Sequence, residues 1–520
     1  MGKRMLFLLI LPVLVFSLAG LAQAWQGRMG GMGDPFGLVA DESDYLIHPA
    51  KITNGQGMRF YGDYRLTYTG VLNWDDELDL FTPAGALLSN FPKETSGNEL
   101  RHEALLGSSF PLGSGRMGLF FQYSGKRGDY DGKQVEFFAP ATFYYDRYDL
   151  KSNLDNFALR LLYGLPVGGL KLGGEVQFAY RQEEQEIIFN EDFGGFRNLW
   201  TNPFQGGLSL AGWRDFFPFM LPYESHYWEA LLKGSLEGKV GPLDVELTLK
   251  GGFLFAGDNT YEYQLQSPIG TLVDGFRLRG DVTGWRLGGD LWARYPLSQD
   301  LSLPFLVSID FQDKSRDGDG PSLATGTYSY NSDEQSLHIT IGGGLDKELA
   351  KGARIAAGIY YNYLQGKNEI KFNQFPTAGG FVDYDYTDFP SSFESQVMLR
   401  LAGELALSHA VTLRMGLTPF IGWVREDYTF SSFVSPLATG FTDDVSTDGL
   451  HWGIGASIGG TIKFKSITLE PFINGGWQQV HLKGSGDSVI NTGVVTTLID
   501  MSKDRDEWSI GGGLSVLFGL

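Results

Sequence analysis

The chain has 520 residues, a formal net charge of −20 and no cysteine. A chain without cysteine has no structural disulfide, no cysteine-ligated zinc, no covalently attached haem and no lipid-modified cysteine anchor. Its acidic balance argues against nucleic-acid partners, because phosphate binding requires a basic surface.

The N-terminus has the three parts of a secretory signal peptide. Lys3 and Arg4 form a basic start, an apolar run covers 5–21, and a small-residue cleavage site follows at 22–24. We therefore expect residues 1–24 to be removed on export. Beyond this run, no stretch approaches the roughly 18 apolar residues that a membrane-spanning helix needs.

Residues 25–56 show no strand alternation and are too long for a simple lead-in to a first strand. Glycines between 27 and 37 supply backbone freedom, whereas Pro35 and Pro49 fix local turns. Considered by themselves, these residues fit either a flexible linker or a folded segment that is separate from the strands.

Apolar and polar residues alternate with a period of two in segments that recur from Met58 to the C-terminus, which predicts strands. In the last segment, Trp508 and Phe518 belong to one face, and Glu507 and Ser515 to the other. About sixteen strands are expected. They start near Met58, Leu100, Arg116, Phe157, Leu170, Tyr227, Leu243, Trp285, Leu301, Gln335, Ala353, Phe393, Val411, His451, Ile467 and Glu507.

The connectors between these segments alternate between tight turns and long polar loops. This alternation is typical of outer-membrane barrels, which have short periplasmic turns and long external loops. We therefore predict an all-β, transmembrane antiparallel β-barrel over 57–520, in the outer membrane of a Gram-negative bacterium and surrounded by its lipids and lipopolysaccharide. A soluble β-sandwich or solenoid is the alternative, but aromatic residues near the strand ends favour the barrel.

The face opposite the apolar one is expected to line the lumen, and it carries charges of both signs. Burying such charges unpaired would be costly, so the lumen is either hydrated or filled by a polar plug. The charges either form a structural network or set selectivity. The candidate lumen residues are Arg59, Asp63, Arg65, Arg101, Glu103, Arg160, Glu175, Arg286, Asp290, Arg294, Arg400, Glu404 and Arg414. Acidic clusters at 75–79, 317–319 and 383–388 are assigned to external loops.

The connector at 183–225, the third external one, is too apolar for a solvated loop. Its candidate ligand-binding residues are Phe193, Phe196, Trp200, Phe204, Trp213, Phe216, Phe217 and Phe219. Three interpretations stay open: a capture site for lipid-like substrates, a constriction folded into the pore, or a loop that packs its own small core. The sequence Asp192-Phe193-Gly194-Gly195 is similar to the Glu-Phe-Gly-Gly of general porin constriction loops.

The segment 25–56 resembles the N-terminal hatch of FadL-type long-chain fatty-acid transporters. Gly27-Arg28 matches the Gly-Arg start of that hatch, and Asp41 and Glu42 follow Ala40 where the family has Ala-Asp-Asp. His48 precedes Pro49 and Ala50 where the family has Asn-Pro-Ala. The resemblance implies a hatch that closes the lumen and moves when a hydrophobic ligand binds. It extends to porin-like accessory proteins of secretion systems. FadL-type barrels have fourteen strands, which makes fourteen the alternative count.

We thus expect a channel for passive uptake of small, hydrophobic molecules that is gated by the hatch. A general diffusion porin, with the third loop as its constriction, is one alternative. A barrel scaffold that holds exported partner proteins is another. An enzyme is not expected, because the seven histidines show no catalytic or metal-ligand spacing. Neither a metal nor a cofactor is expected.

Overall fold

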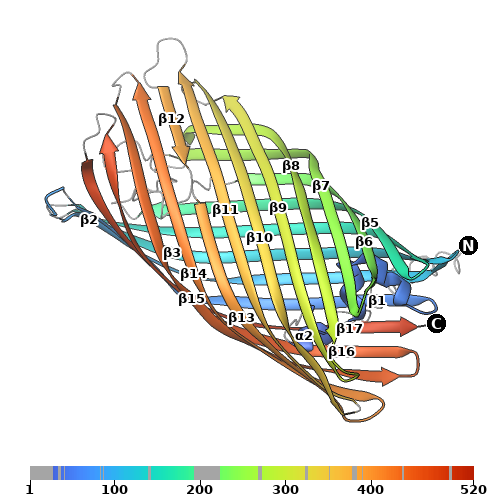
Figure 1. The fold of residues 1–520 in the computed structure, drawn as a ribbon. Helices are drawn as coiled ribbons and strands as arrows, with labels where there is room; N and C mark the ends of the chain where they lie inside the picture. Colours follow the sequence, from blue (N-terminus) through green and yellow to red (C-terminus); the bar gives the residue numbers. More distant parts are fainter. Residues whose placement is uncertain are drawn as a thin grey trace, which may run out of the picture.

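A computed structural model describes residues 27–32, 37–39, 41–81, 83–85, 87–138, 142–191, 223–266, 272–321, 326–350, 352–376, 383–388, 391–435, 439–490 and 495–519. One antiparallel sheet dominates it (Figure 1). The strands are β1 (Arg59–Phe81), β2 (Leu87–Leu112), β3 (Gly115–Phe138), β4 (Thr142–Val167), β5 (Leu170–Glu191), β6 (Tyr223–Val240), β7 (Leu243–Gln266), β8 (Leu272–Pro296), β9 (Leu301–Pro321), β10 (Gly326–Ala350), β11 (Ala353–Pro376), β12 (Asp383–Asp388), β13 (Ser391–Ala406), β14 (Val411–Ser435), β15 (Thr439–Phe464), β16 (Ile467–Ile490) and β17 (Val495–Gly519).

The sheet closes on itself, because β1 pairs with both β2 and β17. Strand β12 pairs with β11 and β14, and so does β13, at other positions along the same two neighbours. These two short strands therefore follow one another in a single position of the wall. The result is a closed barrel with sixteen wall positions, which confirms the predicted count and excludes fourteen.

The strands are longer than predicted. Apart from β12, they have 16 to 26 residues, whereas a transmembrane strand needs about 9–11. Strand β4 begins at Thr142 and β17 at Val495, well before the predicted starts. The period of two fades in these extensions because, above the lipid, both faces of a strand meet water.

Two groups of residues that the sequence assigned to loops lie at least partly in strands, because the period of two fades in these extensions. The acidic clusters at 75–79, 317–319 and 383–388 lie in β1, β9 and β12. The connector predicted at 183–225 is shorter, because β5 continues to Glu191 and β6 begins at Tyr223. Polar residues on both faces of these segments had hidden their strand structure.

An apolar belt surrounds the barrel near its short turns. Large apolar side chains on the outward face are 36–65% exposed, among them Leu159, Leu232, Leu249, Ile359 and Ile473. An exposed apolar surface of this extent is the lipid-facing band of a transmembrane barrel. Among the described residues, no helix is long and apolar enough to cross a membrane.

Outward aromatic pairs mark the upper edge of the belt. Each pair joins two neighbouring strands, about nine to thirteen positions from the short-turn ends, which is close to the length that spans a bilayer. The pairs are Tyr68–Trp508, Tyr180–Trp228, Trp285–Phe311, Tyr363–Phe393 and Trp452–Trp477. The strands thus cross the membrane near the chain ends and project far beyond it.

The N-terminal segment folds inside the barrel at the short-turn end, near the start of β1 and the end of β17 (Figure 1). It contains α2 (Gly27–Gly31) and the 3₁₀ helices η1 (Glu42–Leu46) and η2 (Pro49–Asn54). Pro49 occupies the first turn of η2, where its missing N–H costs nothing. The predicted plugged barrel is confirmed, whereas the predicted signal peptide, 1–24, lies outside the described residues.

Candidate functional site

Apolar side chains of residues 27–57, hereafter the hatch, pack against the inward face of the wall. One buried cluster contains Met29, Met32, Leu38 and Val39 of the hatch with Trp292, Leu306, Ala356, Tyr360 and Ala402 of the wall. A second contains Tyr45, Leu46 and Ile52 of the hatch with Tyr61, Leu105, Phe120 and Leu162 of the wall. Apolar burial, at about 25 cal/mol per Å², favours the docked position.

Small wall residues let the hatch come close. A Cβ placed on Gly173 of β5 would lie 2.1 Å from the backbone nitrogen of Ala50. A Cβ on Gly358 of β11 would lie 2.6 Å from Cδ2 of Leu38. A larger residue at Gly173 would meet the backbone and push the hatch away from the wall, whereas one at Gly358 would displace the Leu38 side chain.

Wall cations bind two backbone carbonyls of the hatch. Arg294 donates to the carbonyl of Leu38 at 2.8 Å. Arg160 and Lys233 both donate to the carbonyl of Leu46, at 2.7 and 2.9 Å. Charge-assisted hydrogen bonds of this kind are among the stronger ones, so these cations hold the hatch in register with the wall.

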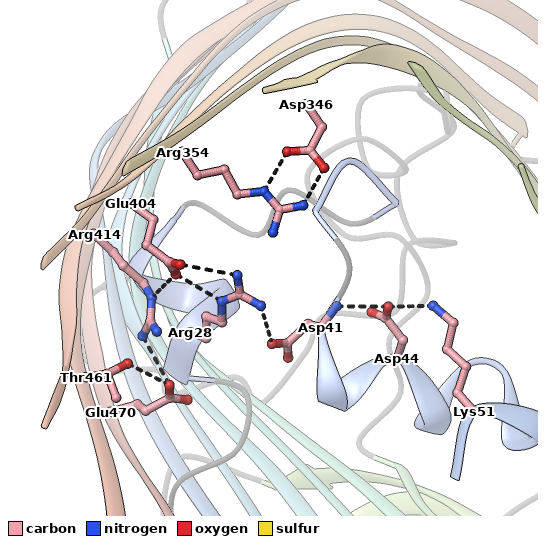
Figure 2. Close-up of polar contacts among 10 residues, drawn as sticks. All are labelled: Arg28, Asp41, Asp44, Lys51, Asp346, Arg354, Glu404, Arg414, Thr461 and Glu470. Atoms are coloured by element: carbon pink, nitrogen blue, oxygen red, sulfur yellow. Dashed lines mark hydrogen bonds and ion pairs between the residues drawn. The ribbon is translucent and has the colours of Figure 1, made fainter. Parts of the chain in front are cut away.

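Arg28 links the hatch to the opposite wall (Figure 2). Its guanidinium donates to Asp41 of the hatch at 3.3 Å and to Glu404 of β13 at 3.0 Å. Glu404 also accepts from Arg414 at 2.8 Å, and Arg414 lies 3.2 Å from Glu470. The side chains of Arg28 and Glu404 are 18% and 20% exposed, so little solvent screens this network.

A second polar cluster surrounds His48. Its Nδ1 lies 2.8 Å from Oγ1 of Thr248, and its Nε2 lies 3.7 Å from Glu246. Glu246 also pairs with Lys51 at 2.9 Å. Burial, together with the ammonium groups of Lys51 and Lys233, lowers the pKa of His48 to about 3.

Acidification is expected to loosen the hatch through His48. An undocked His48 in water would titrate near 6.5, so the docked state binds fewer protons and loses stability as pH falls from about 6.5 to about 3. At pH 5 the docked state is less stable by roughly 2 kcal/mol, because each pH unit below the undocked pKa of His48 costs about 1.4 kcal/mol. Hydrogen exchange of the hatch amides, corrected for intrinsic rates, measures it. In His48→Asn, the change of hatch-amide exchange with pH should vanish. If the exchange still changes with pH as in the unmodified chain, carboxylates rather than His48 cause the pH dependence.

The sequence-predicted hatch residues all fall within this docked segment. Asp41 accepts from Arg28, His48 and Ala50 contact β7 and β6, Pro49 is buried and Glu42 begins η1. The sequence also suggested a functional role for the aromatic residues between 193 and 219, which lie outside the described residues.

The predicted lumen residues lie on the inward face of the wall. Five belong to the hydrogen-bonded groups described above that hold the hatch against the wall: Arg160, Glu175, Arg294, Glu404 and Arg414. Arg65, Arg101 and Glu103 line the cavity described below. The remaining five have other partners. Arg59 donates to the carbonyl of Gln56, and Asp63 lies beside Arg65. Arg286 pairs with Asp310, Asp290 accepts from Ser308, and Arg400 lies over the ring of Tyr360.

Sequence reasoning missed the residues that shape the seat of the hatch. Ser235 accepts from the backbone N–H of Ala50 at 2.6 Å, and Gly173 makes room for that approach. Trp292, which the alternation did not assign to the lumen, packs edge-on against His48 with ring centroids 4.5 Å apart. Small residues on the inward face of neighbouring strands were the available signal, because only a close partner inside the barrel requires them.

A cavity of about 620 Å³ lies beyond the hatch, farther from the short turns, and its lining combines residues of the inward face with Trp477 and Trp508 of the outward face. Phe472 lies at its base, where a Cβ on Gly30 of α2 would be 2.7 Å from the ring. Apolar and aromatic surfaces alternate with charged ones around it. Its inward lining includes Met398, Phe420, Phe472 and Tyr130, and Arg65, Arg101, Glu99, Glu103 and Lys126.

Comparisons with protein-family models and with curated protein sequences find no match for this chain. Among solved structures, it is similar to the toluene transporter TodX of P. putida, with 12% identity, a TM-score of 0.37, and coverage of 96% of this chain and 99% of that one. A FadL homologue of Pseudomonas aeruginosa has 9% identity, a TM-score of 0.42 and coverage of 96% and 98%. The toluene transporter TbuX of Ralstonia pickettii has 11% identity, a TM-score of 0.35 and coverage of 94% and 98%. TM-scores of this size assign neither function nor substrate.

Proposed function

We propose that the chain is an outer-membrane channel for passive uptake of small hydrophobic molecules, with the N-terminal hatch as its gate. The observation that carries this proposal is the docking of the hatch. It joins the two apolar clusters on opposite parts of the wall. A barrel closed by a separate segment can be opened by moving that segment, without breaking the wall.

The cavity beyond the hatch supports the proposal as a holding site. Met398, Phe420 and Phe472 offer apolar surface to a hydrophobic body, and Phe472 also touches the hatch. A ligand that packs on Phe472 therefore competes with α2 for the same ring. This gives binding a direct mechanical link to hatch movement, because a ligand shifts an equilibrium only through contacts that differ between the two states.

The alternatives make different demands on the structure. A general diffusion porin requires an open, hydrated lumen, whereas the hatch occupies this one; the constriction predicted at 192–195 lies outside the described residues. A scaffold for exported proteins would co-purify with partners in fixed stoichiometry. Swelling of liposomes in glucose separates a general porin from the gated channel, because only the porin passes small sugars freely.

Locking the hatch is expected to abolish uptake. The chain has no cysteine, so Ala50→Cys with Ser235→Cys would introduce a single disulfide where the Ala50 nitrogen lies 2.6 Å from the Ser235 hydroxyl. Cells that carry the oxidised double variant should take up a hydrophobic fluorophore at the rate of cells without the chain. Reduction should restore the rate of the unmodified channel.

The single variants Ala50→Cys and Ser235→Cys are the matched controls, and each should transport with or without reductant. Thiol titration establishes that the bond has formed. If uptake stays normal with the disulfide in place, the hatch is not the gate and the proposed function is wrong.

A further inference from the structure

A groove of about 450 Å³ crosses the outward face of β9, β10, β11, β13 and β14 within the apolar belt. Two rows of paired residues build it. The upper row is Leu345, Ala357, Leu401 and Leu417, and the lower row is Leu301, Lys347, Ile355, Gly403 and Met415. The small residues Ala357 and Gly403 form its floor, because their larger neighbours project on either side.

The side chains on either side of this floor are exposed. Leu345 is 49% exposed, Ile355 48% and Met415 56%. They form the sides of a hollow about fifteen times the ~30 Å³ that a water occupies in the liquid. A hollow of this size and lining suits a hydrocarbon chain.

Lys347 lies in the lower row, between Leu301 and Ile355. Its side chain is exposed, and among the described residues it has no ion pair and no hydrogen bond. A cation on the lipid-facing surface extends its ammonium toward the nearest interface, which here is the one at the short turns. Its natural partner there is the phosphate of a lipid headgroup.

We propose that this groove is a phospholipid site, in which one acyl chain lies over Ala357 and Gly403 and Lys347 binds the phosphate. A second copy of the chain fits the groove less well. A twofold contact centred here would bring two Lys347 side chains together. The two rows also contain only nine residues, whereas a stable protein interface takes about 20–30 residues from each side.

Native mass spectrometry of the full chain in detergent tests the site with palmitoyl-oleoyl-phosphatidylglycerol and, as a phosphate-free probe, dioleoylglycerol. The unmodified chain should retain one phosphatidylglycerol. Lys347→Gln should weaken this retention about fivefold, as expected for one lysine on one anionic headgroup, and leave dioleoylglycerol unchanged. Gly403→Leu should displace both, since a Cβ there meets only Met415, at 3.5 Å. Ala293→Leu, on the outward face of β8, is the control and should change neither.

Heat-modified gel mobility establishes that each variant barrel is folded, and Ala357→Leu replaces Gly403→Leu if the latter fails. Equal retention of phosphatidylglycerol by Lys347→Gln and the unmodified chain would overturn the phosphate contact. A dimer mass that disappears in Gly403→Leu would overturn the lipid in favour of a second copy. Because neither readout depends on transport, the site can fail or stand independently of the proposed channel.

Discussion

Deletion of residues 25–56 is expected to turn a silent barrel into a conducting one. The wall closes through the pairing of β1 with β17, which begins at Arg59 and does not involve the hatch. Once the hatch is absent, wall charges such as Arg160 and Lys233 face water rather than the Leu46 carbonyl, and the lumen becomes hydrated. In planar bilayers, the shortened chain should carry a steady current at least about tenfold above that of the full chain.

Two measurements keep this result interpretable. Resistance to heat and detergent should be similar in both chains, since the wall retains its hydrogen bonds. Large steady currents from the full chain would contradict a closed hatch and favour the general porin. Silence after the deletion would contradict the hatch as the only barrier and would point to the aromatic connector after Glu191 as a constriction.

Replacing Arg28 by methionine is expected to release the hatch while leaving the barrel folded. The substitution keeps an apolar stem but removes one partner from each of two largely buried carboxylates, Asp41 and Glu404, the second of which keeps Arg414. Breaking a buried pair costs about 3–5 kcal/mol, and the 18% exposure of Arg28 places the expected loss at the lower end. Hydrogen exchange of the hatch amides should therefore accelerate about a hundredfold, at 1.4 kcal/mol per factor of ten.

Arg127→Met is the matched control for this substitution. Arg127 pairs with Asp155 at 2.6 Å, but its side chain is 43% exposed. Loss of this exposed ion pair should therefore lower stability by less than about 1 kcal/mol. A double-mutant cycle of Arg28→Met with Glu404→Gln then isolates the pair. A coupling energy below about 0.5 kcal/mol would show that apolar packing, rather than this ion pair, holds the hatch.

The membrane half of the fold could be predicted because lipid imposes a simple rule on it. Every second residue must be apolar where a strand crosses hydrocarbon, so segments such as that of Trp508 and Phe518 are visible in the sequence. The upper half follows no such rule. Strand β12 and the strand positions of Asp317 and Asp319 were missed because nothing apolar marks the outer face there.

The site was predictable in its chain segment but not in its contacts. A short motif located the hatch, because its glycines, prolines and acidic residues are local in sequence. The partners of that segment are not local: Arg28 and Glu404 are 376 positions apart, and His48 and Thr248 are 200 apart. Alternation can say that Glu404 faces inward, but only barrel closure decides which hatch residue it meets.

The length of the strands sets where a molecule first meets this protein. A strand of 26 residues measures roughly 85 Å, at about 3.3 Å per residue. With a tilt of about 40°, the wall stands about 65 Å tall, of which the apolar band takes about 25 Å. The mouth therefore opens roughly 40 Å above the lipid. A hydrophobic molecule would enter the barrel from bulk water before it reaches the membrane. Inside the wall, it would pass the layer of lipopolysaccharide that would otherwise slow its approach.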